Sequence, residues 1–109
     1  MKQILKFEIE LDENNLPLNI KMYASDGAAD ENNIKALIVS AWAAKTKETL
    51  RIDLWTKDMP VNEMFIMYHQ TMMGMADTLG RSTGHDKLAE ALRDYCEFFA
   101  EETEIKGAK

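Results

Sequence analysis

The sequence has one cysteine, few prolines and glycines, and no long apolar run, and each shortage excludes a class of protein. Cys96 is the only cysteine and cannot form a disulfide within the chain, so we expect a reducing compartment and a cytoplasmic location. Two prolines and five glycines leave no linker or low-complexity segment that would divide the chain. Charged residues interrupt every hydrophobic stretch, so we predict neither a signal peptide nor insertion into a membrane.

Basic residues are also scarce, because 13 Lys and Arg stand against 19 Asp and Glu and give a net charge of −6. Binding to a phosphate backbone normally needs a clustered basic face, so we expect no nucleic-acid partner. The length of 109 residues fits one domain that buries roughly two-thirds of the surface exposed by the unfolded chain. We therefore predict a single domain over residues 1–109.

Four stretches combine strand-forming residues with turn signals at their ends, namely residues 4–11, 17–23, 34–42 and 49–56. The last stretch alternates cleanly, with Leu50, Ile52 and Leu54 on one face and Arg51, Asp53 and Trp55 on the other. Alanines in the third stretch leave a helix open as an alternative there. The pattern predicts a four-stranded antiparallel meander over about residues 4–56.

Two helices are predicted to follow, over about residues 60–79 and 84–104. Pro60 is tolerated at a first helical position, and the segment from Gly80 to Gly84 should end the first helix. Thr83 and Asp86 have the spacing of a capping box for the second helix. The predicted fold class is α+β, with both C-terminal helices packed on one face of the sheet.

The first helix carries two apolar stripes, which bears on function. The broader stripe should meet the sheet and consists of Met64, Phe65, Tyr68, Met72, Met75 and Leu79. Ile66 and Met73 lie seven residues apart on the far side of this helix. Either the neighbouring helix or a loop covers them, or they form an interface with a second copy or another protein.

No set of side chains has the spacing of a catalytic or metal site. His69 has no second ligand three or four residues away, and His85 is explained by loop solubility and helix capping. Acidic neighbours and aromatic surroundings should keep Cys96 buried and inert. Asp53 and Asp58 lie five residues apart, one on a predicted strand and one at a predicted helix start, and this spacing alone defines no acid/base pair. We therefore expect no enzymatic activity, no metal and no cofactor.

Several segments carry a resemblance to a known family. The words "ETLRIDLWTKDMPVNEM", "YHQT" and "MADT", with the earlier "ELDENNLP" and "SDG", resemble the gliding-motility protein GldC family of the Bacteroidetes. The similarity spans residues 10 to about 99. It implies a small soluble accessory protein that supports gliding motility, and it implies no catalytic residues.

Two hypotheses for function follow. The first is a protein that binds a motility component or a second copy of itself, with candidate contact residues Arg51, Asp53, Trp55, Ile66 and Met73. The alternative is a small-molecule-binding or hydrolytic domain with a pocket between sheet and helices, using His69, Tyr68 and Asp53 as its polar groups.

Overall fold

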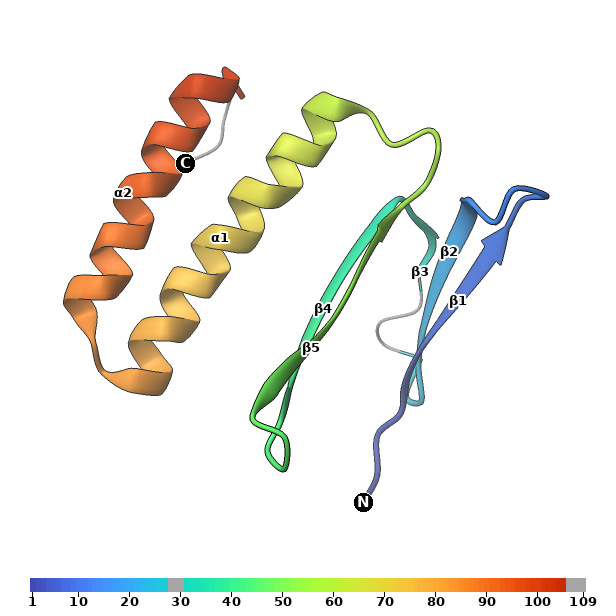
Figure 1. The fold of residues 1–109 in the computed structure, drawn as a ribbon, viewed down its shortest axis with the longest axis horizontal. Helices are drawn as coiled ribbons and strands as arrows, with labels where there is room; N and C mark the ends of the chain where they lie inside the picture. Colours follow the sequence, from blue (N-terminus) through green and yellow to red (C-terminus); the bar gives the residue numbers. More distant parts are fainter. Residues whose placement is uncertain (28–30, 106–109) are drawn as a thin grey trace. The chain divides into compact units, whose positions relative to one another are not determined.

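The computed structural model describes residues 1–27 and 31–105, and Figure 1 traces the chain. Within these described residues five strands precede two helices, and the fold class is α+β as predicted. The strands are β1 (Leu5–Leu11), β2 (Pro17–Ala24), β3 (Glu31–Ile34), β4 (Ala36–Ala43) and β5 (Glu48–Trp55), and the helices are α1 (Val61–Thr83) and α2 (Asp86–Thr103). Residues 1–59 form one compact unit with all the strands, and a second unit begins at Pro60 and holds both helices. The single domain and the packing of the helices on one sheet face stay predictions.

The hairpin of β1 and β2 is confirmed, and its turn is built around one carboxylate. Asp12 Oδ1 accepts hydrogen bonds from the backbone N–H groups of Asn14 (2.8 Å) and Leu16 (3.0 Å). Asn15 takes the left-handed conformation with φ of 62°, which asparagine tolerates better than most residues. The pattern of turn residues between two alternating runs therefore predicted this hairpin correctly.

The core of the first sheet lies where three isoleucines meet. Ile20 of β2 is fully buried, and it pairs with Ile9 of β1 on one side and Ile34 of β3 on the other. Directly paired residues of antiparallel strands project from the same face, so these three side chains share one face. The alternation in β1 and β2 positions them there.

The third predicted strand is divided, and the single four-stranded meander is wrong in detail. Ile34 ends β3, which pairs with β2, while Ala36 begins β4, which pairs only with β5 among the described strands. The result is a three-stranded sheet of order β1-β2-β3 and a two-stranded sheet of β4 and β5, both antiparallel. Residues 36–39 are all apolar, so no period of two was available to reveal a change of sheet at Lys35. Residues 31–33, between the second and third predicted strands, belong to β3, and residues 28–30 lie outside the described residues.

Helix α1 is longer than predicted, because it continues through Gly80 to Thr83. A single glycine inside a helix costs only about 1 kcal/mol, which the rest of a long helix can offset. The helix ends instead at Gly84, which has φ of 72° and donates its N–H to the Gly80 carbonyl oxygen over 2.9 Å. A left-handed residue at this position is the usual glycine cap of a helix C-terminus.

Helix α2 begins with a different cap from the predicted capping box. Thr83 belongs to α1, and its hydroxyl donates to the Leu79 carbonyl oxygen over 2.6 Å. His85 is the N-cap instead, and its Nδ1 accepts from the Leu88 backbone N–H over 3.2 Å. An imidazole nitrogen thus replaces the hydroxyl that the Thr-x-x-Asp spacing suggested.

The two helices form an antiparallel hairpin whose contact is lined by small residues. Ala76 of α1 and Ala89 and Cys96 of α2 are at most 1% exposed. A Cβ placed on Gly80 would lie 3.5 Å from the Ala89 Cβ, so the helices approach closely near the turn. At the other end, the rings of Phe65 and Phe99 meet edge to face with centroids 6.1 Å apart.

Candidate partner-binding surface

Strand β5 presents an ion pair on its outer face. Arg51 Nη2 lies 2.9 Å from Asp53 Oδ2, and the two side chains are 61% and 49% exposed. The register places Arg51 opposite Ser40 and Asp53 opposite Ile38, which confirms the predicted alternation. Exposed pairs of this kind contribute about 0–1 kcal/mol to stability. Both side chains can therefore exchange this ion pair for ion pairs with another molecule.

Two tryptophans lie at the ends of this same face. Trp55 pairs with Ala36 and is 57% exposed, while Trp42 pairs with Thr49 and is 67% exposed. Arg51, Asp53 and Trp55 alternate along β5 and therefore project from one side of it. Trp42 pairs directly with Thr49, which lies on that same side, so all four side chains project from one side of the β4–β5 ladder. We call this side the tryptophan face, defined by Trp42, Arg51, Asp53 and Trp55.

The segment after β5 is anchored by two further ion pairs. Lys57 Nζ lies 2.9 Å from Asp12 Oδ2, and Lys35 Nζ lies 2.7 Å from Asp58 Oδ2. The Thr56 hydroxyl, on a residue 1% exposed, donates to Asp58 Oδ1 over 2.7 Å. No local sequence pattern indicates this anchor, since its partners are separated by 23 and 45 residues.

Both anchoring carboxylates are held in their ionised form. The Lys35 ammonium and the Thr56 hydroxyl lower the pKa of Asp58. The pKa of Asp12 is lowered mainly by the Leu16 backbone N–H, with Lys57 as the next cause. Asp53 is bonded to Arg51 and Asp58 to Lys35, so each of these two carboxylates has its own cation.

On α1, the two predicted far-side residues are half-buried. Ile66 and Met73 are spaced along the helix so that they share a side with Gln70 and Asp77. This side is linked to α2, because Asp77 Oδ1 lies 3.0 Å from Arg93 Nη2. Contact of Ile66 and Met73 with a partner stays a prediction.

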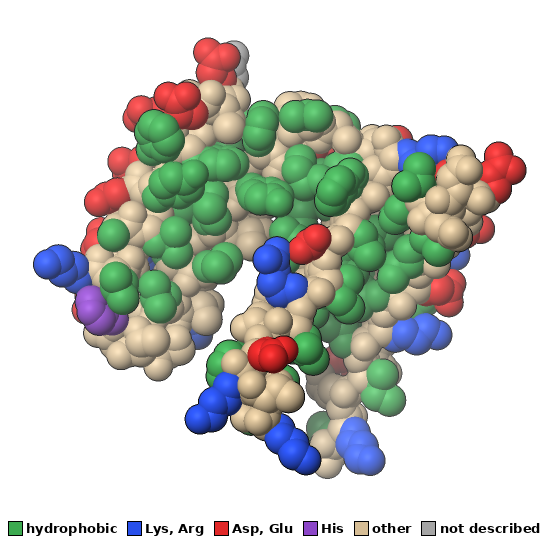
Figure 2. Space-filling model, viewed as in Figure 1, with side chains coloured by type: hydrophobic (Ala, Val, Ile, Leu, Met, Phe, Trp, Pro, Cys, Tyr) green, Lys and Arg blue, Asp and Glu red, His purple; other side chains and the backbone are tan. Residues whose placement is uncertain are grey.

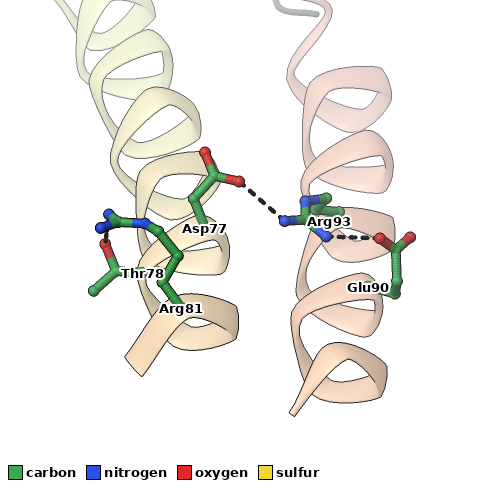
Figure 3. A network of polar contacts seen from close by, with 5 residues as sticks. All are labelled: Asp77, Thr78, Arg81, Glu90 and Arg93. Carbon is green, nitrogen blue, oxygen red and sulfur yellow. Dashed lines mark hydrogen bonds and ion pairs between the residues drawn. The ribbon is translucent and has the colours of Figure 1, made fainter. Parts of the chain in front are cut away.

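Figure 3 shows the polar network that joins the helices on this side. Arg93 bridges Asp77 of α1 and Glu90 of α2, and its pKa is raised mainly by Asp77. Arg81 donates to Thr78 Oγ1 over 3.4 Å. A hollow of about 480 Å³ lies at this end of the hairpin, lined by Asp77, Gly80, Arg81, Asp86 and Arg93. With Arg93 bonded to two carboxylates, this hollow offers only Arg81 as a cation without a carboxylate partner in the network drawn.

The opposite side of the hairpin is apolar. Figure 2 shows hydrophobic side chains gathered over the helices, with Asp and Glu side chains along the outer edge of α2. The exposed members on α1 include Tyr68 and Met75, and those on α2 include Leu88, Tyr95 and Phe98. Exposed apolar areas of this kind are typical of surfaces that bind another molecule.

The two histidines and the cysteine are either buried or used in a helix cap. His69 is 5% exposed on α1, and His85 caps α2. Burial raises the pKa of the Cys96 thiol, which keeps it in the unreactive protonated form. Within residues 1–27 and 31–105, no three His, Cys, Asp or Glu side chains are placed to hold a metal ion. The same residues contain no helix with the length and apolar character needed to cross a membrane.

Comparison with known proteins gives one finding. The family model described as "Gliding motility-associated protein GldC-like" matches residues 17–105, which include the tryptophan face and both helices. No curated protein and no solved structure matches the chain. The resemblance found in the sequence is thereby confirmed over most of its length. The chain belongs to the GldC-like family of gliding motility-associated proteins.

Proposed function

We propose that this chain is a non-enzymatic accessory protein of gliding motility, which acts by binding another protein of the motility machinery. Family membership supports the link to motility. The tryptophan face is the proposed binding surface. A cytoplasmic location belongs to the same proposal and depends on the lone, buried Cys96, whose free thiol suits a reducing compartment.

The observation that carries this proposal is the exposure of two tryptophans on one face. Trp42 and Trp55 are 67% and 57% exposed, although tryptophan is among the side chains that gain most from burial. Tryptophan and arginine are enriched among the residues that dominate binding energy at protein interfaces. Arg51 and Asp53, between the two rings, add charges that can select a partner.

The proposal is tested by affinity capture of the tagged chain from its native cells, followed by mass spectrometry. We expect the parent chain to recover motility components and Trp55→Ala to lose them. Leu50→Ala is the matched control, because Leu50 is 60% exposed but projects from the opposite side of β5. Retained capture by a folded Trp55→Ala chain would contradict the assignment of this face.

A second surface on α1 is tested in the same assay. Met73→Glu adds a charge on the half-buried side shared with Ile66, while Gln70→Glu adds the same charge at an exposed neighbouring position. If Ile66 and Met73 contact the partner, Met73→Glu reduces capture and Gln70→Glu does not. Equal capture by both variants would assign Ile66 and Met73 to the hairpin itself.

The alternative, a small-molecule-binding or hydrolytic domain, has less support. His69 is buried, and the Asp53 carboxylate is bonded to Arg51. The described hollow on the hairpin is lined by other residues than the predicted His69, Tyr68 and Asp53. No observation on these three side chains favours this alternative.

A further inference from the structure

Strand β5 has a neighbour on only one of its two edges among the described residues. β4 pairs with it over the full strand, from Ala43 opposite Glu48 to Ala36 opposite Trp55. The Thr56 N–H donates to the Lys35 carbonyl oxygen over 2.8 Å, which continues the same ladder. In an antiparallel pair, every second residue of a strand bonds to the neighbouring strand. Because Thr56 bonds to Lys35, the even-numbered residues of β5 are the ones whose backbone groups bond to β4.

The odd-numbered residues of β5 therefore direct their N–H and C=O groups away from β4. These residues are Thr49, Arg51, Asp53 and Trp55. The free edge ends at Lys57, whose N–H donates to the Pro17 carbonyl oxygen over 3.2 Å. A row of unpaired backbone groups on an exposed strand is a template for pairing with another chain.

The sequence of β5 is complementary to itself when read in the opposite direction about Ile52. In that antiparallel register, Arg51 lies opposite Asp53 of a second copy, and Leu50 lies opposite its Leu54. Thr49 likewise lies opposite Trp55, and Ile52 lies opposite its own copy. Arg51 and Asp53 each meet the opposite charge, Glu48 meets the uncharged Thr56, and the Leu and Ile side chains meet one another.

The hydrogen-bond pattern agrees with this register. Pairing about Ile52 joins odd residues with odd residues, which are the residues with outward N–H and C=O groups. A register shifted by one residue would pair outward groups with inward ones and set Arg51 opposite an apolar side chain. The free edge of β5 thus specifies both the direction and the alignment of its partner strand.

We propose that two copies of this chain pair antiparallel along the free edges of their β5 strands, centred on Ile52, and form a continuous four-stranded sheet. This inference rests on the proposed function, because it uses Arg51, Asp53 and Trp55 of the tryptophan face, and it identifies a second copy as the occupant of the β5 edge. Residues 49–55 carry one positive and one negative charge, so the net charge of −6 on each chain does not oppose their pairing directly.

The edge of β4 is less suited to this role. Its outward residues, by the same alternation, are Ala36, Ile38, Ser40 and Trp42, which carry no charge. Without charges, neither direction nor register would be selected. Pairing along β5 also covers side chains that are now exposed, since Leu50 and Ile52 are 60% and 53% exposed.

Charge reversal tests the proposal on the purified full chain, with the mass measured by sedimentation equilibrium. We expect the parent chain to dimerise, at twice the 12.5 kDa of one chain. Arg51→Asp and Asp53→Arg each set like charges opposite one another, and each should weaken the dimer by about tenfold or more. An equimolar mixture of these two variants should restore association as a heterodimer, because every facing pair is then of opposite sign.

This mixture also separates folding from pairing. Two chains that associate together but not alone are both folded. A parent chain that stays monomeric up to about 1 mM overturns the proposal. A dimer that neither charge reversal weakens also overturns it. If the dimer is absent while capture of motility components continues, the proposed β5–β5 pairing is contradicted and the proposed function stands.

A cysteine at the centre of the strand tests the register. Directly opposite residues of a non-hydrogen-bonded pair have Cα atoms about 4.5 Å apart, within the range of a disulfide. Ile52→Cys should therefore form a disulfide-linked dimer under mild oxidation. Arg51→Cys faces Asp53 rather than itself and should crosslink far more slowly, and the parent chain, whose Cys96 is buried, should not crosslink. Equal crosslinking by both variants would overturn the register.

Discussion

At the residue scale, the glycines of α1 differ sharply in what they contribute. Gly74 lies inside the helix with open space around its Cα, whereas Gly84 takes a left-handed conformation at its end. A side chain at Gly74 would reduce the entropy of the unfolded chain without strain. At Gly84 the same side chain meets no neighbour, but the backbone conformation itself becomes unfavourable.

We therefore predict opposite effects of the same substitution at these two positions. Gly74→Ala should raise the free energy of unfolding by about 0.5–1 kcal/mol. Gly84→Ala should lower the free energy of unfolding by about 1 kcal/mol, because a backbone φ of 72° is unfavourable for alanine. Urea unfolding followed by helix circular dichroism measures both, and equal effects would contradict the assigned C-cap.

A second residue-scale prediction concerns Asp12. Its folded pKa is lowered from 3.8, so its contribution to stability is fully present above pH 3.8 and is lost as pH falls through the lower folded value. Asp12→Asn keeps an oxygen that can accept from the backbone N–H groups but removes the charge that pairs with Lys57. The parent chain should have the higher urea midpoint near neutral pH.

This advantage should shrink once the pH falls below 3.8, because a protonated Asp12 no longer attracts Lys57. Measuring the urea midpoints of both chains across this range provides the check. A constant difference at all pH values would show that the turn geometry, and not the charge, distinguishes the two side chains.

At the scale of elements, the hairpin depends on small residues where its helices meet. Ala76 is fully buried, and larger side chains in a close-packed contact force shifts that cost about 1–3 kcal/mol. We predict this loss for Ala76→Leu, measured by thermal unfolding. Ala91→Leu should change stability by less than about 0.5 kcal/mol, because Ala91 is exposed on α2. Similar losses for both would contradict the placement of Ala76 in the contact.

The elements also show what the sequence can and cannot predict. The β1–β2 hairpin and β5 were predicted because alternation and turn residues are local signals. The division at Lys35 was not, because consecutive apolar residues fit several pairings equally well. The α1 boundary was missed since Gly80 and Gly84 look alike in sequence, and only the backbone angles distinguish them.

The residues of the candidate surface were likewise predicted only in part from the sequence. Alternation correctly placed Arg51, Asp53 and Trp55 together on one face. The addition of Trp42 to that face needed the register between β4 and β5, which no local pattern gives. The ion pairs of Lys57 and Lys35 required knowledge of which distant segments meet after folding.

At the scale of the whole molecule, acidic charge and exposed apolar area act against each other. The net charge of −6 opposes association through surfaces other than the paired β5 edges at neutral pH, while Tyr95 and Phe98 remain about half exposed beside the acidic side chains of α2. Near the pI of about 4.9 this repulsion disappears. The exposed apolar areas are then free to associate.

We predict that the chain associates beyond a dimer as the pH approaches 4.9, and that light scattering reports a rising mass. A chain carrying both Tyr95→Ser and Phe98→Ser has the same formal charge at neutral pH but less exposed apolar area. It should associate less at the same pH. If both chains associate equally, the loss of repulsion acts through another surface, and the Leu50 side of β5 becomes the next to test, since Leu50 is 60% exposed.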